Sequence, residues 1–395
     1  MTALSGIRVI DASHVLAGPY CAMLLADMGA DVVKLESPQG GDHSRHMAPK
    51  LPEGFSGAFV AVNRNKRGVA IDLKTESGRN TMHRLVGSAD VLIENYRPGV
   101  AARLGMDYST LRTINPRLVH CSISGFGQTG PYASRGGFDL IAQGMSGLMS
   151  VTGEPDGGPV KCGPPITDLG AGLFATYGIL SALTARERTG EGQQVDTSLF
   201  EAGLALEVWE AVEHFHTGRT PAPTGSGHRL GAPYQAFRCA DGYFTVGADS
   251  PRHWPAFCEL IGAAELAEDP RFATNDDRLE NLADLVRQIE EKTARQPREY
   301  WLTRLEEVGI PAGPINTVPE ALEDPQTRAR DMVQEVTSPT LGSLRALGPP
   351  VKLSATPASI RTAAPRLGEH TAEVLSEIGV TEQEFATLKE QGALG

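Results

Sequence analysis

The strongest constraint on the fold is an alternation of short apolar runs with helix-length segments. Residues 7–13 (IRVIDAS) and 31–36 (DVVKLE) have the Val, Ile and Leu content of strands that are buried on both faces. The segment between them, residues 19–28, carries apolar residues at helical spacing and is followed by Gly29, which permits the left-handed turn that ends many helices. This βαβ unit predicts parallel strands joined by a right-handed crossover.

The same alternation continues to about residue 216. Further strands are predicted at residues 69–73, 91–95, 118–123 and 194–198. Further helices are predicted at residues 76–86, 139–149, 169–187 and 199–216. We therefore expect an α/β fold, with an open parallel Rossmann-like sheet in a large domain and a smaller α+β domain.

Changes in composition suggest where these domains begin and end. We expect a large domain over residues 1–216, which is completed by residues 345–395 at the end of the chain. Residues 217–231 are dense in Gly and Pro and predict a linker with a glycine loop. A small α+β domain follows over 232–330, with a hairpin at Ala240-Asp241-Gly242, and 331–344 form the return linker.

Charge and cysteine content exclude several classes of protein. The net charge of −12 argues against general nucleic-acid binding, which needs a basic face. The five cysteines are scattered, with no CxxC pair, so neither a disulfide framework nor a metal site is predicted. The first 14 residues do not resemble a signal peptide, and the longest uncharged apolar stretch, 169–185, is short for a membrane span. We expect a cytoplasmic protein.

The charge is unevenly distributed along the chain. Residues 1–135 carry 15 Lys and Arg against 11 Asp and Glu, a net charge of +4, whereas the remainder carries −16. A basic first third in an acidic protein indicates an anionic ligand there, although scattered surface charge gives the same sum.

One glycine motif resembles a dinucleotide site but lacks its context. Residues 125–130 (GFGQTG) fit G-x-G-x-x-G after a predicted strand. A dinucleotide fingerprint also needs a helix that opens within the glycines, and here Pro131 and the loop-like residues 132–137 follow. The sequence contains neither a phosphate-binding P-loop nor a GxSxG nucleophile motif.

Asp168 is the strongest candidate for chemistry. It follows a Pro-rich segment and directly precedes the predicted helix, so it is either a helix N-cap or a reactive carboxylate. Gly170 and Gly172 place small residues at the start of this helix. Their amides are candidate donors to a developing oxyanion.

Long stretches of the chain resemble the class III CoA-transferases, the family of formyl-CoA:oxalate and carnitine CoA-transferases. The family also includes 2-methylacyl-CoA racemases. The resemblance extends over nearly the whole sequence and includes LSGIRVIDASHVLAGPYCAMLLADMGADVVKLESPQGGD, NRNKRGVAIDLKTESG, DVLIENYRPGVAARLGMDY, SISGFGQTGPYASRGGFDLIAQGMSGLMSVTG, ITDLGAGLFATYGILSAL, GEGQQVDTSLFEA and GIPAGPINTVPEAL.

The resemblance implies a covalent mechanism in which Asp168 is the nucleophile. The carboxylate attacks an acyl-CoA to give a mixed anhydride, and CoA thiolate then forms an aspartyl-CoA thioester that an acceptor acid consumes. A carboxylate needs no partner base, which fits the lack of a triad motif. The implied partners are an acyl-CoA and a small carboxylic acid, with CoA as substrate and no permanently bound cofactor. The resemblance also implies an interlocked homodimer.

The resemblance further implies which residues contact CoA. The implied contacts are Val15, Ala17, Ile71, Lys74, Asn95, Arg97 and Arg103, with Arg135 and Gly136 as further candidates. Arg and Lys suit the phosphates of CoA. Leu16 and Ser37 depart from the Gln and Arg of formyl-CoA transferase-like members, which argues against oxalate or formate as substrate. Residues 224–231 (TGSGHRLG) loosely match the family's active-site glycine loop.

Three alternatives were weighed against CoA transfer. A 2-methylacyl-CoA racemase needs a second proton-transfer group, and Phe138 stands where its His is expected. The neighbouring Asp139 is then interpreted as the cap of its own helix. A non-catalytic acyl-CoA-binding protein would not need Asp168, and a nicotinamide oxidoreductase would depend on the glycines of 125–130.

Overall fold

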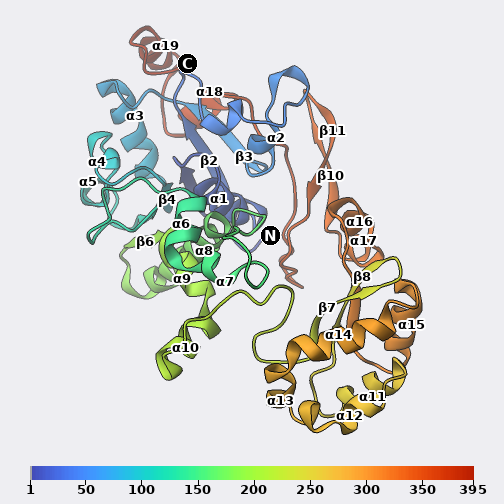
Figure 1. The fold of residues 1–395 in the computed structure, drawn as a ribbon. Helices are drawn as coiled ribbons and strands as arrows, with labels where there is room; N and C mark the ends of the chain where they lie inside the picture. Colours follow the sequence, from blue (N-terminus) through green and yellow to red (C-terminus); the bar gives the residue numbers. More distant parts are fainter. Residues whose placement is uncertain (1) are drawn as a thin grey trace. The chain divides into compact units, whose positions relative to one another are not determined.

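The structure is a computed structural model that describes residues 2–395. The chain forms two compact units (Figure 1). The first unit comprises Met1–Leu148, Lys161–Phe215 and Pro325–Gly395, and the second comprises Met149–Val160 and His216–Asp324.

A six-stranded parallel sheet forms the centre of the first unit, as predicted. Its spatial order is β3-β2-β1-β4-β5-β6, and every neighbouring pair is parallel. Because β2 and β4 lie on opposite sides of β1, the connections reverse direction between β1 and β4. Ligands of open α/β sheets bind at such a point, beyond the carboxyl ends of the strands. The strands are β1 (Arg8–Asp11), β2 (Asp31–Glu36), β3 (Lys66–Ala70), β4 (Val91–Glu94), β5 (Val119–Ser124) and β6 (Gln194–Ser198).

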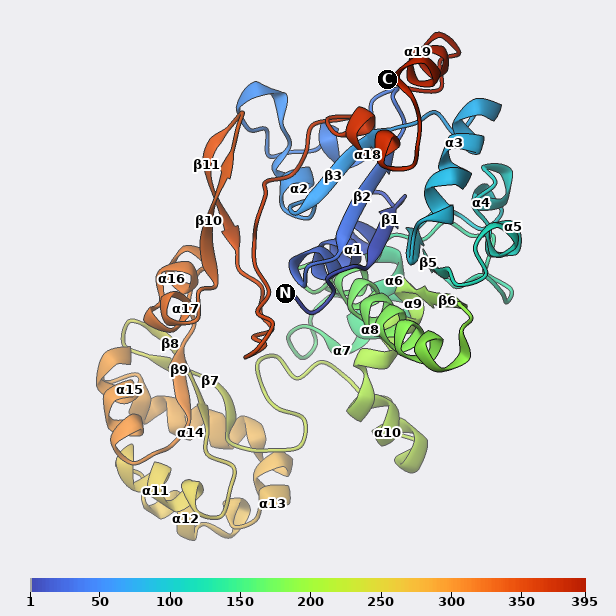
Figure 2. The ribbon, with the colours of Figure 1, turned by 180° about the vertical axis from the view of Figure 1, so that it is seen from behind.

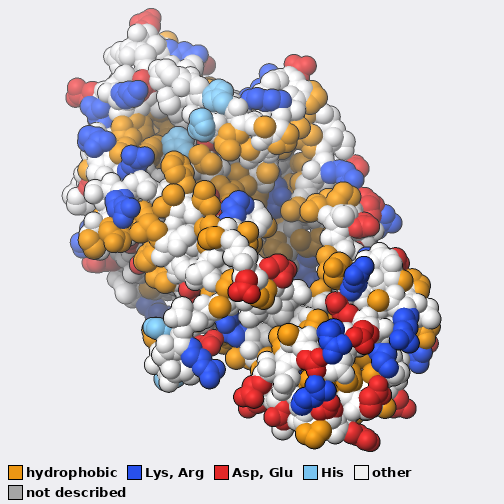
Figure 3. Space-filling model, viewed as in Figure 1, with side chains coloured by type: hydrophobic (Ala, Val, Ile, Leu, Met, Phe, Trp, Pro, Cys, Tyr) orange, Lys and Arg blue, Asp and Glu red, His pale blue; other side chains and the backbone are white. Residues whose placement is uncertain are grey.

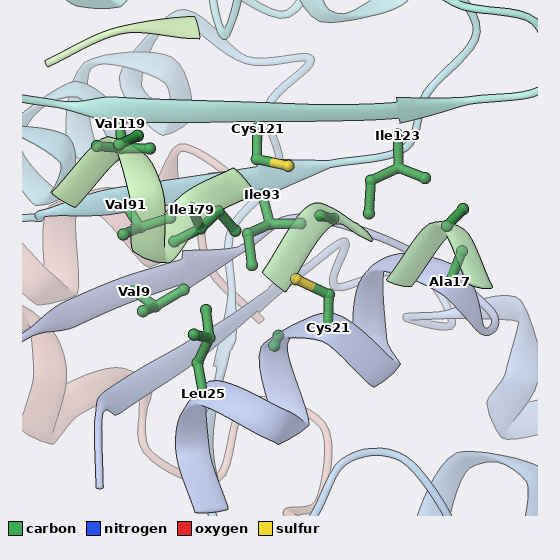
Figure 4. Close-up of a cluster of buried hydrophobic side chains, with 14 of the residues drawn as sticks. Val9, Ala17, Cys21, Leu25, Val91, Ile93, Val119, Cys121, Ile123 and Ile179 are labelled. Carbon is green, nitrogen blue, oxygen red and sulfur yellow. The ribbon is translucent and has the colours of Figure 1, made fainter. Parts of the chain in front are cut away.

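Helices cover both faces of this sheet. On one face α1 and α8 lie side by side, and their residues Cys21 and Ile179 pack with Val9 and Ile93 of the strands (Figures 2 and 4). On the other face α3 and α5 pack together with the C-terminal helices α18 and α19. The helices named in and around this unit are α1 (Ala17–Asp27), α2 (Gly57–Val60), α3 (Glu76–Gly87), α4 (Val100–Arg103), α5 (Tyr108–Ile114), α6 (Asp139–Ser146), α7 (Leu148–Val151), α8 (Ile166–Thr189), α9 (Leu199–Leu206), α10 (Val208–Thr217), α17 (Pro325–Ala329), α18 (Thr371–Glu377) and α19 (Glu382–Glu390).

Three local predictions were wrong. Strand β3 begins at Lys66, three residues before the predicted strand. The prediction missed this start because Lys66 is charged and does not extend the apolar run, although it is buried in an ion pair with Asp11. The helix predicted over 199–216 is divided at Glu207 into α9 and α10. An antiparallel hairpin of β10 (Val333–Ser338) and β11 (Gly342–Leu347) stands where a linker was predicted, because its exposed strands alternate weakly.

The second unit contains a three-stranded antiparallel sheet, and its predicted hairpin is confirmed. Strands β7 (Tyr234–Cys239) and β8 (Gly242–Gly247) flank the predicted turn, and β9 (Ala312–Pro314) pairs with β8. Figure 3 shows acidic and basic side chains interspersed on the visible surface of this unit. Its helices are α11 (His253–Leu260), α12 (Glu265–Glu268), α13 (Asn275–Glu280), α14 (Leu282–Thr293), α15 (Arg298–Glu307) and α16 (Val318–Glu323).

Helix α8 is the longest element of the first unit. By length and composition alone it is, among residues 2–395, the one helix that meets the requirements for crossing a membrane. Its buried face, which includes Ala171, Ala175 and Ile179, belongs to the core on the sheet (Figure 4).

Candidate active site

The candidate site lies at the carboxyl ends of β1 and β4, where the connections of the sheet reverse direction. The two strand ends are joined by a reciprocal pair of hydrogen bonds: the His14 N–H donates to Asn95 Oδ1, and Asn95 Nδ2 donates to the His14 carbonyl, both at 2.7 Å. The His14 ring also lies against Tyr96, with Nε2 3.1 Å from the phenol oxygen. Burial and the nearby Lys34 lower the pKa of His14.

A pocket of about 210 Å³ opens beside these strand ends and brings Asp168 together with the loop after β1. Its walls come from five parts of the first unit: the loop after β1, the end of β4, the end of β5 with the loop that follows it, the start of α8 and the start of α9. The lining residues are His14, Val15, Leu16, Ala17, Asn95, Ile123, Ser124, Gly125, Gly137, Phe138, Asp168 and Leu199.

Asp168 lies inside the first turn of α8 and is not its N-cap. The helix begins at Ile166, three residues earlier than predicted, and the N-cap position is Pro165, which provides no side-chain cap. The Asp168 side chain is therefore not engaged as a cap and lines the pocket. Its position near the positive end of a 24-residue helix favours negative charge at this carboxylate.

The cap of α8 comes from another helix. Asp139 Oδ1 accepts hydrogen bonds from the Thr167 N–H at 3.0 Å and the Thr167 hydroxyl at 2.8 Å. Gln143 Nε2 holds the other oxygen at 2.7 Å. The prediction that Asp139 caps its own helix was wrong, because α6 has Phe138 as its N-cap and Asp139 reaches across to the start of α8.

Asp168 has an unusually basic carboxylate. Burial, and then the neighbouring negative charge of Asp139, raise its pKa from 3.8 to about 7. A carboxylate with a pKa near neutrality is more nucleophilic than an ordinary one and is still substantially ionised at physiological pH. Such a group in a pocket is a candidate for covalent chemistry.

Gly170 and Gly172 lie beyond the first turn of α8, where backbone amides donate to carbonyls four residues earlier in the helix. A Cβ at position 172 would lie 2.8 Å from the Ala17 carbonyl oxygen and 3.0 Å from a ring carbon of Tyr20. Gly172 thus allows α1 to approach α8 closely. A Cβ at position 170 would make ordinary contacts of 3.6 Å with Ala202.

The positions that the resemblance assigns to CoA follow the carboxyl ends of β1, β3 and β4, three strands of the parallel sheet, of which β1 and β4 are adjacent. Val15 and Ala17 follow β1, Ile71 and Lys74 follow β3, and Asn95 and Arg97 follow β4, with Arg103 at the end of α4. Val15, Ala17 and Asn95 line the pocket with Asp168. Lys74, Arg97 and Arg103 are exposed at this edge, whereas the Ile71 side chain is buried in the core below it.

Arg135 and Gly136 lie in the loop that follows β5. The Arg135 guanidinium lies 4.7 Å from the ring centre of Tyr132. Gly136 lies against Arg97, because a Cβ at Gly136 would approach an Arg97 guanidinium nitrogen to 2.9 Å. Two arginine-bearing segments from different strands therefore meet at this edge of the sheet.

The GFGQTG motif is part of the pocket wall. No helix opens within it, since residues 125–138 contain none and the next helix begins at Asp139. Gly125 packs backbone to backbone against Gly137, where a Cβ on either residue would lie within 2.7 Å of the other Cα. These glycines allow two loops to meet next to the pocket.

Sequence reasoning missed several residues of the pocket wall. His14, Ser124 and Leu199 line it but were not singled out. Ser124 ends β5, Leu199 directly follows β6, and His14 lies three residues after the end of β1, so their positions at the carboxyl edge were a usable signal. Leu199 begins the helix after β6 and had no chemical feature that marks it.

Comparisons with known proteins agree on one family. Residues 4–371 match the model of CoA-transferase family III. A succinate–glutarate CoA-transferase of Agrobacterium fabrum is 39% identical over 386 residues, 96% of each chain. A formyl-CoA:oxalate CoA-transferase of Streptomyces avermitilis is 39% identical over 99% of each chain. The crystal structure of a CaiB/BaiF family protein from Brucella suis matches with a TM-score of 0.85 and 40% identity, over 95% of this chain and 99% of that one.

Proposed function

The chain belongs to CoA-transferase family III and transfers CoA between an acyl-CoA and a carboxylic acid, and we propose that the Asp168 carboxylate is the nucleophile of this transfer. The observation that carries the proposal is the position of this carboxylate. It lies in a pocket at the carboxyl edge of the sheet, and its pKa is raised to about 7. The resemblance of the surrounding ITDLGAG segment to the family supports the same assignment.

In the first half-reaction an Asp168 oxygen attacks the thioester carbonyl of the donor. The carbon–sulfur bond breaks, the electron pair leaves with the CoA thiolate, and a mixed anhydride remains on Asp168. The thiolate then attacks the aspartyl carbonyl, which releases the donor carboxylate and leaves an aspartyl-CoA thioester. The acceptor carboxylate repeats these two steps in reverse order, and Asp168 is regenerated as a carboxylate.

Each tetrahedral intermediate places negative charge on a former carbonyl oxygen. The sequence suggests the Gly170 and Gly172 amides as donors to this charge, but both lie within the hydrogen-bonding ladder of α8. The amino terminus of α1 is better suited. Within residues 2–395, the N–H groups of Ala17 and Gly18 donate to no protein group, and Ala17 lines the pocket. One such donor contributes about 3 kcal/mol in other acyl-transfer enzymes.

CoA is expected to bind along the carboxyl edge of β1, β3 and β4. Lys74, Arg97 and Arg103 supply positive charge there, and Arg135 adds a further guanidinium from the neighbouring loop. The thioester end reaches Asp168 through the pocket, which Val15, Leu16, Ala17 and Asn95 help to line. The excess of basic residues in the first third of the chain is consistent with this placement.

A homodimer is the expected assembly, on the resemblance to the family. Helix α8 has an apolar face away from the sheet, where Leu173, Phe174, Tyr177 and Leu180 are exposed, with Tyr177 at 71%. Phe215, at the end of α10, is 76% exposed. Exposed apolar surface of this extent is typical of an interface. Light scattering of the purified protein tests this assembly, and a monomer would contradict it.

Trapping the covalent intermediate tests the role of Asp168. Incubation with acyl-CoA and then hydroxylamine should convert Asp168 to a hydroxamate that mass spectrometry locates in its peptide. D168A should lose both labelling and turnover, whereas D139N, the matched carboxylate control, should still be labelled at Asp168. Normal CoA exchange by D168A would show that the nucleophile is another group.

A further inference from the structure

Four buried charges lie next to the pocket wall formed by residues 14–17. They are Asp11 on β1, Lys34 on β2, Lys66 on β3, and Asp42 in the loop after β2, and none of the four side chains is exposed. Lys34 Nζ lies 3.1 Å from Asp42 and 3.6 Å from Asp11, and Lys66 Nζ lies 2.8 Å from Asp11. Two positive and two negative charges balance in this cluster.

Burial of such a cluster needs an explanation beyond stability. Removing charges from water is costly, and apolar side chains of similar size often stabilise a protein as well or better. A buried charge cluster is therefore better explained when its hydrogen bonds hold the backbone in a particular local conformation. The contacts of this cluster show which conformation that is.

The cluster binds the backbone of the segment between β1 and α1 and of the first turn of α1. Both oxygens of Asp42 accept from the Val15 N–H, at 3.0 and 3.2 Å. The Lys34 ammonium donates to the Ser13 carbonyl, and the Lys66 ammonium donates to the Pro19 carbonyl at 2.8 Å. The path of this segment is thus fixed by charged groups that are closed to water.

Val15 requires such a restraint because its backbone is strained. Its φ is +66°, in the left-handed region that a β-branched residue rarely adopts. The carboxylate of Asp42 is itself oriented by the N–H and the hydroxyl of Ser44, both at 2.8 Å. The fixed Asp42 carboxylate therefore holds the N–H of Val15, a residue that would otherwise favour an extended conformation.

We propose that Asp42 is a positioning residue for CoA transfer, which holds Val15 in its left-handed conformation and thereby aims the start of α1 at the Asp168 carboxylate. Lys34 supports it by compensating its buried charge. The proposal rests on the proposed function, because it takes Asp168 as the reacting group. The residues after Val15 are Leu16, the N-cap of α1, and Ala17, which lines the pocket, so a change at Val15 redirects both.

Substitution D42N tests the proposal, because asparagine keeps the shape of the side chain but loses its charge and one acceptor oxygen. If the amides at the start of α1 are displaced, they stabilise the oxyanion of the transition state less, whereas binding of the substrate changes little. We expect kcat to fall by about 100-fold, while KM for acyl-CoA changes by less than about threefold. A thermal melt monitors folding in parallel.

A glycine at position 15 should rescue the defect. Glycine adopts positive φ without steric cost, so V15G/D42N should recover at least about tenfold in kcat relative to D42N. The matched control is L16G/D42N, because Leu16 has a φ of −132° and gains no relief from glycine. We expect no recovery in this control. Wild-type kcat in D42N, or equal recovery with both glycines, would overturn the proposal.

A milder variant covers the case in which D42N does not fold. S44A removes one of the hydrogen bonds that orient Asp42 and leaves the charge balance intact. We expect a loss of about three- to tenfold in kcat, which V15G reverses; unchanged kcat in S44A would also overturn the proposal. Labelling of Asp168 in the wild-type chain tests its role as nucleophile separately from the positioning role of Asp42. If Asp168 is labelled but D42N and S44A are fully active, only the positioning role fails.

Discussion

Asp139 accepts two hydrogen bonds from Thr167, one from its N–H at 3.0 Å and one from its hydroxyl at 2.8 Å. This single side chain therefore caps α8, whose own N-cap residue is a proline. It also places a negative charge beside Asp168, the residue after Thr167, and contributes to the raised pKa of that carboxylate. Fixing the helix start and raising the pKa of the proposed nucleophile are two effects of one side chain.

The raised pKa of Asp168 predicts an acid limit to activity. Below pH 7 the carboxyl group becomes protonated and loses its nucleophilicity, so kcat should fall by about tenfold for each further pH unit. D139N removes the neighbouring charge but keeps an oxygen that can accept from Thr167. Since burial, the larger cause, remains, we expect the acid limb of the kcat profile to shift only partly to lower pH.

D139A is the control for this experiment, because it removes the charge and the cap together. It should shift the pH profile in the same direction and also lower the free energy of unfolding by about 1 kcal/mol. A D139N profile identical to that of the wild-type enzyme would show that Asp139 does not influence Asp168 electrostatically.

Asp168 also predicts how stability depends on pH. Its pKa in the folded chain is about 7, above the ordinary value of 3.8, so the folded state holds this proton more tightly than the unfolded state. Its contribution to stability is therefore complete below about pH 4 and is lost as the pH rises to about 7. D168N should be more stable than the wild-type chain at pH 8, by about 2 kcal/mol once partial exposure is allowed for.

Thermal melts at two pH values check this prediction. At pH 4 the wild-type carboxyl is protonated in the folded state, so the Tm difference between D168N and wild type should nearly vanish. The same Tm difference at pH 4 and pH 8 would contradict the assigned pKa. D107N is a useful comparison, because the pKa of Asp107 is lowered by hydrogen bonds to Ser109 and Thr110 despite its partial burial.

The centre of the sheet could be predicted from sequence because strands such as β2 and β4 are buried on both faces. The VVKL and VLI segments of β2 and β4 carry the necessary apolar runs. The start of β3 could not be placed, since Lys66 looks like a surface residue until its partner Asp11, 55 positions away, is known. The β10–β11 hairpin was missed because exposed strands lack a strong pattern.

The sequence singled out Asp168 and some of the residues that line the pocket with it, but not the local geometry of the site. Asp168 stood out through its neighbours in sequence, whereas the true cap, Asp139, comes from 28 positions away and depends on how α6 meets α8. The role of Gly172 likewise depends on the approach of α1. Sequence spacing suggested free amides there, but only the helix start at Ile166 determines which amides are free.

Arg97 provides a test of the CoA-binding edge. R97A should raise the Kd for CoA by about tenfold, because a charged hydrogen-bonding group to a phosphate is lost. R97K should recover only part of this affinity, since lysine offers a point charge without the guanidinium geometry. The matched control is R112A: Arg112 on α5 is exposed and lies 3.8 Å from Glu191.

Isothermal titration with CoA measures these affinities at low and high salt. The effect of R97A should shrink as salt increases, because the interaction is exposed to solvent. Equal Kd values for R97A and R112A at low salt would remove Arg97 from the CoA site.

Gly170 and Gly172, near the start of α8, should respond differently to alanine. At position 172 the new Cβ would lie 2.8 Å from the Ala17 carbonyl oxygen, a backbone atom that cannot move alone. G172A should therefore push α1 away from α8, lower the free energy of unfolding by about 1–3 kcal/mol and reduce kcat.

At position 170 the contacts would be ordinary, at 3.6 Å or more. G170A should leave Tm unchanged or raise it, because alanine favours a helix over glycine by about 1 kcal/mol. Both variants keep the backbone N–H, so a difference in Tm and kcat between them reports packing. Equal losses would instead indicate that this side of α8 needs open space for a ligand.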